Sequence, residues 1–455
     1  MTPLTAGIAD FAASIQDRRI PQPCIDGARV GLVDCVGVMI AGAQEPASRI
    51  VARMVAASTS NDGAPEIPSG RNLAPADAAL VNGVAAHALD YDDVAMDGHP
   101  SAALVPAILA EGWALDASGR DALSAYVAGY EVWALAQELE PGHLHERGFH
   151  PTAIWGTLSA VVACARLNRL DATQSRNAIA IAASMAAGLV ANFGSMTKPL
   201  HVGRTAQAGV LAVRLAKDGF TGSPDALEHP AGFMRAHSAS GNPSLEPRDW
   251  RLGEDWRMPK LGVNVKRYPM CYATHRSIDA MLDLAGEHDL SPDAVDEIHV
   301  RIGHMQRLML RNRNPKTALE AKFSLEFAMA SALVARRVGL SELDDAFVQR
   351  GDIVETMRKV HCTTTEDILP DAPFAPADSV SIVLKSGKTL AHPPVAQAKG
   401  SWQKPLSDDE LREKFFDCAA GALGRSQTGA LFDRLSAIEQ LASLRELPLV
   451  ALARA

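Results

Sequence analysis

The first half of this 455-residue chain is a succession of alanine-rich helical segments separated by Gly, Pro and Asp. Apolar residues recur at helical spacing, and several segments begin with Asp or Pro and are followed by Gly, which are the usual signals of helix start and stop. Helices are expected at Leu4 to Ile15, Pro23 to Ile40, Asp77 to Leu89, Pro100 to Leu115, Asp121 to Leu139 and Asp171 to Ala187. Alanine favours closely packed helices, so the sequence predicts a mainly α fold.

The pattern changes after Lys266, where segments with strand-like alternation appear. Val295 to Ile302 alternates as a half-buried strand, and Ser379 to Leu384 does the same before a hairpin turn at Lys385 to Lys388. Between the strands we expect helices at Leu319 to Arg336 and Ser341 to Ala346. These features predict a small α+β unit.

The end of the chain returns to the helical pattern. Helices are expected at Leu406 to Gly421 and at Leu431 to Leu444, whereas residues 222–262 look like a long irregular connection. Because 455 residues exceed the usual size of one hydrophobic core, two domains are expected. We predict an all-helical domain from residues 1–264 and 403–455, and an α+β domain from residues 265–402.

Composition excludes several classes of function. The net charge is −9 and no basic tract is present, so a nucleic-acid partner is not expected. No long apolar run or signal-like start is seen, which predicts no membrane span and a cytoplasmic location. The cysteines are scattered without a C-x-x-C pair, which argues against structural zinc or iron–sulfur sites and favours reduced thiols. No G-x-S-x-G, G-x-G-x-x-G, Walker A or H-E-x-x-H motif occurs in a supporting context.

A cationic stretch lies between Met196 and Phe220. Lys198, His201 and Arg204 fall within seven residues, and a small-residue helix is expected to begin near Gly203 and to end at Gly219. The three side chains would then lie on the turn entering the helix, where free N–H groups and the helix dipole favour an anion. A basic surface turn without a ligand is the alternative.

An acidic cluster follows the helix that ends near Leu89. Asp90, Asp92 and Asp93 precede a Gly-His-Pro turn that contains His99, and His87 lies three residues before Asp90, so that the two could pair. An aspartate and a histidine close together could serve as general base and acid. A Mg²⁺ site or a capped, solvated turn between helices would use the same residues.

Two further clusters place a cation or an imidazole beside proline. His150 precedes Pro151 at the start of an apolar helix, where it could donate to an oxyanion or simply be satisfied in a turn. Residues 266–275 join the two predicted parts of the chain and form either a ligand site or a basic linker. Cys271 lies in this segment, and we favour a structural or contact role for it over a nucleophilic one.

Taken together and in this order, the motifs resemble the MmgE/PrpD family, which includes 2-methylcitrate dehydratases, cis-aconitate decarboxylases and iminodisuccinate epimerases. The resemblance spans nearly the whole chain. The matching segments are His87-Ala-Leu-Asp-Tyr-Asp-Asp93, Gly98-His-Pro-Ser101, Gly148-Phe-His-Pro151, Lys198-Pro-Leu-His-Val-Gly-Arg204, Gly219-Phe-Thr-Gly222, Lys266 to His275 and Glu320-Ala-Lys-Phe-Ser-Leu325.

The resemblance implies a large all-helical domain built from both chain ends, a smaller α+β lid domain, a homodimer, and a di- or tricarboxylate substrate. It implies no cofactor and no metal. Carried over by position, the catalytic residues are Asp90, His99, His150 and Lys198, and the substrate-binding residues are His201, Arg204, Lys266, Tyr268 and His275.

Two departures from the decarboxylase members bear on the reaction. Val94 and Phe327 stand where those members carry a threonine and a tyrosine, and the loop from Asp90 to His99 is slightly shorter. Residues 192–198 and 318–326 look closer to the epimerase branch. We interpret the chain as a carbon–oxygen lyase similar to 2-methylcitrate dehydratase. The alternatives are an epimerase of an iminodisuccinate-like dicarboxylate, a cis-aconitate decarboxylase-like enzyme and a non-catalytic carboxylate-binding scaffold.

The chemistry that these activities share is a carbanion next to a carboxylate. Lys198, Lys266 and helix N-termini would stabilise the developing enediolate. Asp90 or His150 would act as base, and His99 would be the opposing acid.

Overall fold

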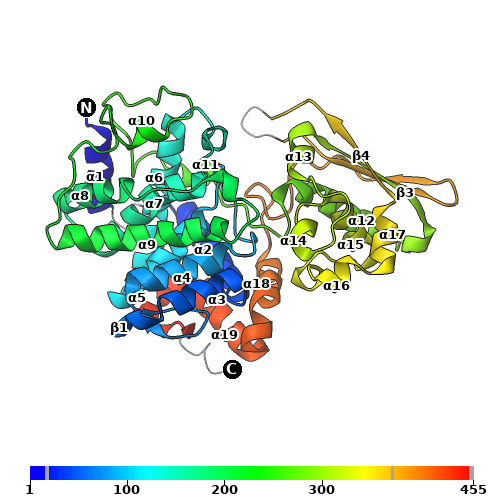
Figure 1. The fold of residues 1–455 in the computed structure, drawn as a ribbon, viewed down its shortest axis with the longest axis horizontal. Coiled ribbons are helices and arrows are strands. Elements are labelled where there is room, and N and C mark those ends of the chain that lie inside the picture. The colour runs from blue at the N-terminus through cyan, green and yellow to red at the C-terminus, as the bar shows by residue number, and fades with distance from the viewer. Residues whose placement is uncertain (16–19, 370–373, 450–455) are drawn as a thin grey trace. The chain divides into compact units, whose positions relative to one another are not determined.

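The computed structural model describes residues 1–15, 20–369 and 374–449. They form two compact units, one from residues 1–264 and the chain from 410 onward, the other from residues 265–409. Helices dominate the first unit, and a small sheet with short helices forms the second, in agreement with the predicted mainly α class (Figure 1).

The first unit contains most of the long helices, and a short antiparallel pair of strands, β1 (Thr59–Pro65) and β2 (Asn72–Leu73). Its helices are α1 (Leu4–Ser14), α2 (Gln22–Gly42), α3 (Pro46–Met54), α4 (Pro75–His87), α5 (Pro100–Ala114), α6 (Gly119–Leu139), α7 (Pro151–Leu167), α8 (Ala172–Ala183), α9 (Thr197–Lys217), α10 (Phe233–His237), α11 (Met258–Leu261), α18 (Asp408–Leu423) and α19 (Arg425–Ser436).

Small residues let the central helices approach each other closely. Helices α4 and α9 run side by side (Figure 1), and a Cβ on Gly203 would lie 2.4 Å from the carbonyl oxygen of Leu80. A Cβ on Gly83 would likewise lie 2.8 Å from the Cα of Gly203. Both distances are too short for any side chain, so glycine is required at this crossing. The contact brings the end of α4 and the start of α9 to the same region.

Helix α9 begins earlier than the sequence suggested. We expected its start near Gly203, but the first helical residue is Thr197, so Lys198 and His201 lie inside the helix and not on a preceding turn. Pro199 is compatible with this start because the N–H groups of the first turn have no partner within the helix.

The last predicted helix was also misplaced. Helix α19 covers Arg425–Ser436, whereas we expected Leu431 to Leu444. Gly424, with φ 74°, separates α18 from α19, and the polar first turn of α19 concealed its start. The chain then continues through short 3-10 turns at Ile438–Gln440 and Leu444–Glu446.

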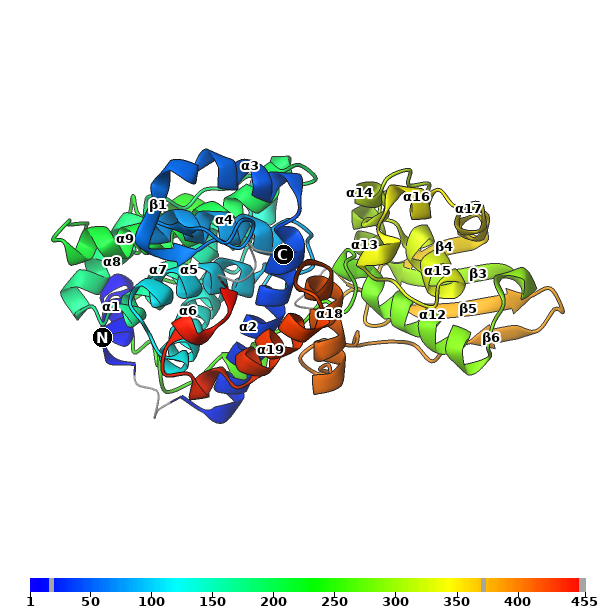
Figure 2. The same cartoon turned by 90° about the horizontal axis from the view of Figure 1, so that it is seen from below.

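The second unit is built on a four-stranded sheet of order β4-β3-β5-β6. Strand β3 (Val295–Gly303) is antiparallel to β5 (Ser379–Leu384) and parallel to β4 (Val360–Thr365), which the sequence did not predict. Strand β6 (Thr389–Ala391) completes the predicted hairpin. The helices are α12 (His275–Glu287), α13 (His304–Met309), α14 (Ala318–Ala321), α15 (Leu325–Val334), α16 (Asp345–Val348) and α17 (Gly351–Met357). Figure 2 shows α12 lying along the sheet.

The single helix expected from Leu319 to Arg336 is two helices in the structure. Ser324 accepts a hydrogen bond from the backbone N–H of Phe327 and so caps α15. Thr317 caps α14 in the same way through the N–H of Glu320. These local caps compete with a continuous helix.

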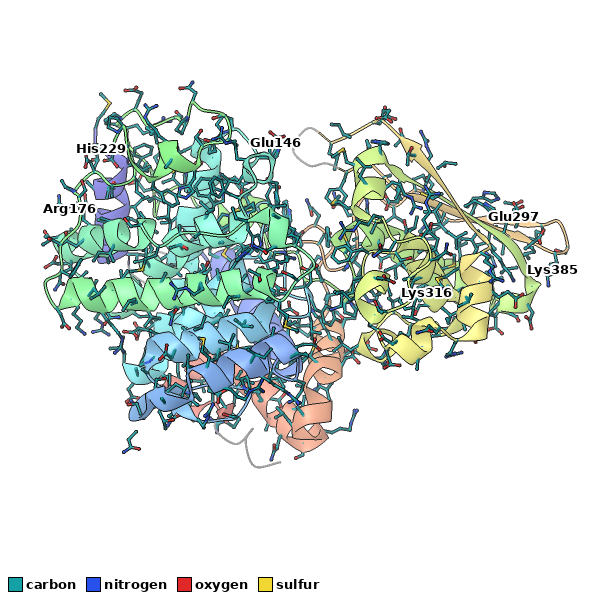
Figure 3. All side chains as sticks on the ribbon, in the orientation of Figure 1. Glu146, Arg176, His229, Glu297, Lys316 and Lys385 are labelled. Carbon is teal, nitrogen blue, oxygen red and sulfur yellow. The ribbon has the colours of Figure 1, made fainter. Side chains whose placement is uncertain are left out.

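Ionisable side chains project from the surface of both units, as Glu146 and His229 of the first unit and Lys316 and Lys385 of the second show (Figure 3). All six cysteines are free thiols. Among the described residues, every helix is too short or too polar to cross a bilayer.

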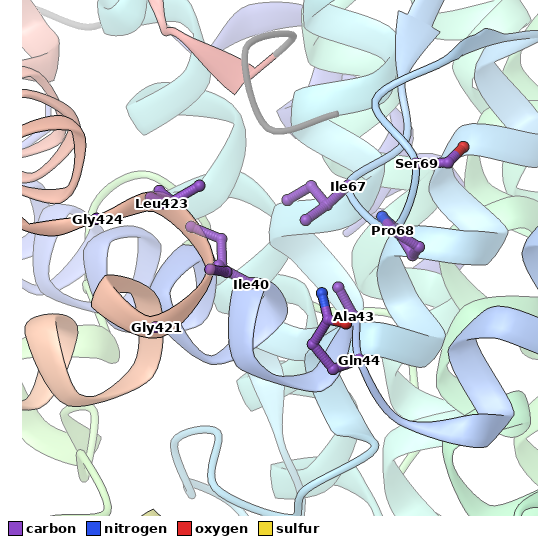
Figure 4. Close-up of a pocket in the computed structure, with 10 residues that line it drawn as sticks. Ile40, Ala43, Gln44, Ile67, Pro68, Ser69, Gly421, Leu423 and Gly424 are labelled. Atoms are coloured by element: carbon purple, nitrogen blue, oxygen red, sulfur yellow. The ribbon is translucent and has the colours of Figure 1, made fainter. Parts of the chain in front are cut away.

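A cavity of about 950 Å³ lies in the first unit, between the C-terminal ends of α2 and α18 and the loop after β1 (Figure 4). Ile40, Ile67 and Leu423 are among its lining residues, and none of the predicted site residues lines it.

Candidate active site

Four helix ends meet in the first unit and carry most of the predicted site residues. His87 is the last residue of α4, His99 and His150 are the N-caps of α5 and α7, and Lys198 lies in the first turn of α9. The ring centroids of His87 and His99 are 4.5 Å apart, and those of His87 and His150 are 5.7 Å apart. Three helix N-termini therefore face one region, which favours an anion.

Asp90 lies at the accessible side of this cluster. Its Oδ1 is 3.0 Å from Nζ of Lys198 and 3.7 Å from Nε2 of His99. The side chain of Asp90 is 20% exposed and that of Lys198 is 15% exposed, so a small molecule can reach both. The backbone of Asp90 has φ 54°, a left-handed conformation that turns the chain sharply after α4.

Asp92 lies behind Asp90 and is fully buried. Its carboxylate is 2.9 Å from Nδ1 of His87 and 3.1 Å from Nδ1 of His99. Although burial raises the pKa of Asp92, His87 and His99 hold it well below its usual range. Burial lowers the pKa of His87 to about 4, so the neutral ring donates to an ionised Asp92.

The suggested pairing of His87 with Asp90 was therefore wrong. Helix α4 ends at His87, and the left-handed turn at Asp90 sends the chain back so that Asp92 reaches the imidazole. Asp92 orients His99 through Nδ1 and leaves its Nε2 facing Asp90. This arrangement can exchange a proton with a bound molecule.

His150 and His201 form a buried pair with 3.3 Å between their Nδ1 atoms. Burial and the neighbouring His87, Lys198 and His99 lower the pKa of His150 far below its usual value. Burial and Lys198 also lower the pKa of His201. His150 is thus a neutral ring and a weak base, which suits a hydrogen-bond donor better than the predicted alternative of a general base.

Phe193 covers this edge of the cluster. The ring centroid of Phe193 is 4.9 Å from that of His150 and 5.0 Å from Nζ of Lys198. The aromatic face supports the lysine ammonium and shields the histidine from water.

Arg204 lies on another face of α9. It is exposed and its guanidinium bonds to Gln207, one turn further along the same helix. At about 100° per residue, Arg204 is about 120° around the helix from Lys198. The structure therefore separates it from the cluster that contains Lys198 and His201.

The other three predicted residues belong to the second unit. Tyr268 is buried and its hydroxyl donates to Oδ1 of Asp279 at 2.7 Å. His275 is fully buried, with Nε2 3.3 Å from the carbonyl oxygen of Met270 and its ring beside Tyr268. Lys266 is buried too. Tyr268 and His275 thus contribute to the interior of their own unit, and their role in substrate binding stays a prediction.

The cluster also contains donors that could hold a metal ion. Within the described ranges, the ligand atoms of His87, Asp90, Asp92 and His99 lie within 4.8 Å of one another. Two imidazoles with two carboxylates suit zinc better than the Mg²⁺ considered from the sequence. The ammonium of Lys198, however, already supplies positive charge at Asp90.

Sequence reasoning missed the roles of His87, Asp92 and Phe193. His87 and Asp92 were noted as parts of the motif, but the residue spacing favoured Asp90 as the partner of His87. Because Asp90 has a positive φ, the partner of His87 is Asp92 and not Asp90. The spacing of residues in the sequence does not reveal a positive φ. Phe193 had no signal beyond its proximity to Lys198 in the sequence.

Comparisons with known proteins identify the family of the chain. The model of the MmgE/PrpD N-terminal domain matches residues 6–246, and that of the MmgE/PrpD C-terminal domain matches residues 268–436. The chain is 32% identical to a cis-aconitate decarboxylase of Homo sapiens, over 81% of this chain and 78% of that protein. The cis-aconitate decarboxylase of Mus musculus is also 32% identical, over 81% and 77%.

A cis-aconitate decarboxylase of Aspergillus terreus is 22% identical over 98% of this chain and 95% of that protein. The two family models and these relatives support a lyase. The chain belongs to the MmgE/PrpD family, as the resemblance implied.

Proposed function

We propose that this protein is a lyase that acts on a small polycarboxylate through a carbanion next to a carboxylate, and that cis-aconitate is its substrate. The observation that carries the proposal is the partly exposed group of Asp90, His99 and Lys198 at the meeting point of three helix N-termini. Decarboxylation is favoured over the dehydration that we expected first, because the named relatives are cis-aconitate decarboxylases.

The residues of the cluster have different roles in the proposed reaction. Lys198 and the N–H groups of the helix starts hold carboxylate oxygens and neutralise the charge that develops when CO₂ leaves, an effect worth roughly 3–4 kcal/mol for a well-placed donor. His99, held at Nδ1 by Asp92, uses Nε2 to transfer a proton to the substrate carbon. The electron pair of the broken C–C bond stays on the substrate carbon and takes this proton, and solvent water then reprotonates His99, with Asp90 at Nε2 as the relay. Asp90 also holds Lys198.

Phe327 and Val94 lack the hydroxyls of the decarboxylase members, and the two residues lie in different surroundings. Phe327 is fully buried and its ring lies 6.3 Å from that of Phe347, so it fills the core of the second unit. The absence of a hydroxyl at Phe327 is therefore explained by packing in this core. Val94 lies directly after the buried acids and pairs through its backbone with Asn264. Val94 has an apolar side chain where the decarboxylase members carry a threonine. For this reason dehydration is the second candidate function.

One experiment separates the reactions. The purified protein is incubated in D₂O with cis-aconitate, 2-methylcitrate or iminodisuccinate and followed by NMR. Loss of CO₂ from cis-aconitate with deuterium in the product supports the proposal. Loss of water from 2-methylcitrate supports the dehydratase, and exchange without net loss supports the epimerase. The absence of reaction and exchange with all three would favour a non-catalytic carboxylate-binding scaffold. The homodimer, the lid role of the second unit and the cytoplasmic location stay predictions.

A further inference from the structure

A buried polar network lies behind the loop of residues 90–98, which carries Asp90 and Asp92. Among the described residues, its only lysine is Lys414 of the C-terminal helix α18. Nζ of Lys414, on α18, is 2.5 Å from Oδ1 of Asp34 on α2 and donates to the backbone carbonyl oxygen of Tyr91 at 3.0 Å. The side chains of Lys414 and Asp34 are 3% and 1% exposed.

Lys414 also lies over the aromatic ring of Tyr91, with Nζ 4.1 Å from the ring centroid. Tyr91 stands between Asp90 and Asp92, the two carboxylates of the site. Its carbonyl and its ring are thus both held by one ammonium group. The residue before it, Asp90, has the strained φ of 54°, a conformation that persists only where surrounding contacts determine it.

Asp93 completes the network on the other side of the loop. Its Oδ1 accepts a hydrogen bond from the backbone N–H of Ser101, and burial together with Asp92 and Asp34 raises its pKa well above its usual range. The charged form of Asp93 is thus disfavoured. Asp34, whose Oδ1 lies 2.5 Å from Nζ, is the ion-pair partner of Lys414. The network is polar, fully buried and outside the proposed chemistry.

We propose that Lys414 is a positioning residue that holds the Asp90–Asp93 loop in its active conformation through the carbonyl and ring of Tyr91. Only the expected effect of Lys414 on kcat rests on the proposed function; its effect on the loop does not. Helix α18 provides a firm base for this lysine, because a Cβ on Gly37 of α2 would lie only 2.9 Å from the ring of Phe415. The C-terminal helix then contributes to the site without touching a substrate.

The test compares a single with a double variant. Lys414→Met leaves Asp34 buried without its cation, so it is expected to destabilise the protein. Asp34→Asn with Lys414→Met removes both charges and restores stability, yet still lacks the donor to Tyr91. Arg412→Met, on the same helix but paired with Asp433 at the surface, is the control.

Two readouts keep the proposal separate from the proposed function. Hydrogen–deuterium exchange of the 90–98 loop is expected to be at least tenfold faster in the double variant than in the wild type, with α2 and α18 unchanged. With an established substrate, kcat is expected to fall at least tenfold while KM changes less than twofold. Wild-type loop exchange in the stable double variant would overturn the proposal, even if no polycarboxylate is turned over. Loop exchange that rises equally in the Arg412→Met control would overturn it too.

Discussion

The core of the second unit and the candidate site of the first unit differ in how their ionisable groups are paired and exposed. In the second unit, Arg276 lies 2.8 Å from Asp378, and the same carboxylate accepts hydrogen bonds from Gln306 and Ser277. Each group has its partners within the core. In the first unit, Asp90, His99 and Lys198 lie beside one another and remain partly exposed. The difference separates a network that stabilises the fold from one whose groups are available to a ligand.

The histidines illustrate the same contrast. His275 of the second unit is fully buried among aromatic rings, whereas His99 of the first unit is fixed by Asp92 at one nitrogen and presents the other at the accessible side. His275 contributes to the interior of its unit, and its role in substrate binding stays a prediction. A histidine oriented by a buried carboxylate and open at its second nitrogen can perform acid–base chemistry.

The largest effect that tests this contrast is on stability. Arg276→Met leaves Asp378 buried without its ion-pair partner, and breaking such a pair costs about 4 kcal/mol. The free energy of unfolding is measured by urea denaturation. Arg350→Met removes an exposed pair with Asp352 and should cost less than about 1 kcal/mol. If Arg276→Met were as mild as the control, the network would not be structural.

Lys198→Met should instead reduce activity and leave the fold intact. Loss of one charge-stabilising donor lowers kcat roughly 100- to 1,000-fold. The free energy of unfolding should change by less than about 1 kcal/mol, because Lys198 is partly exposed. Lys217→Met, on the same helix and bonded to Asn168, serves as control for kcat. Equal turnover in the two variants would exclude Lys198 from the site.

The buried imidazole of His87 predicts a pH effect of intermediate size. Its pKa is about 4 in the folded protein and about 6.5 in the unfolded chain, so between these values only the unfolded chain binds the proton. This contribution to stability is complete above about pH 6.5 and is lost as the pH falls towards 4. Between pH 7 and pH 5 it amounts to about 2 kcal/mol.

The measurement compares the free energy of unfolding at pH 7 and pH 5. His87→Gln should lose about 2 kcal/mol less than the wild type over this interval, since the titrating group is gone. His299→Gln, at an exposed position of β3, should keep the wild-type dependence. A wild-type pH dependence in His87→Gln would mean that His87 is charged in the folded protein.

Arg204→Ala should have the smallest effect. The exposed guanidinium faces Gln207 and lies on another side of α9 from Lys198, so KM and kcat should each change less than about twofold. Steady-state kinetics with cis-aconitate measure both constants. A KM increase of tenfold or more would restore the sequence-based expectation that Arg204 binds the substrate.

Much of this fold can be predicted from the sequence because local signals agree with the tertiary structure. Pro100 and Pro151 mark helix starts, and the alternation of Ser379 to Leu384 gives β5 without error. Strand β4 was missed because its partner in the sheet is distant in sequence and runs parallel to it. The early start of α9 was missed because Pro199 and Gly203 suggested a later one.

The candidate site was predictable at the level of motifs but not of partners. Asp90, His99, His150, Lys198 and His201 lie close together, and their catalytic and binding roles stay predictions. The choice of Asp92 as the partner of two histidines depends on a left-handed residue at position 90. The contact of Lys414 with Tyr91 joins residues 323 positions apart, and no local pattern predicts such a pairing.

The most direct test of the central claim is solvent exchange at the substrate carbon in two neighbouring variants. Asp90→Asn removes the carboxylate that faces Lys198 and His99, whereas Asp97→Asn alters an aspartate of the same loop that also has a positive φ but bonds to His143. With cis-aconitate in D₂O, we predict that Asp90→Asn incorporates deuterium roughly 1,000-fold more slowly than the wild type. Asp97→Asn should match the wild type. Equal incorporation by both variants would contradict the assignment of this cluster as the acid–base site.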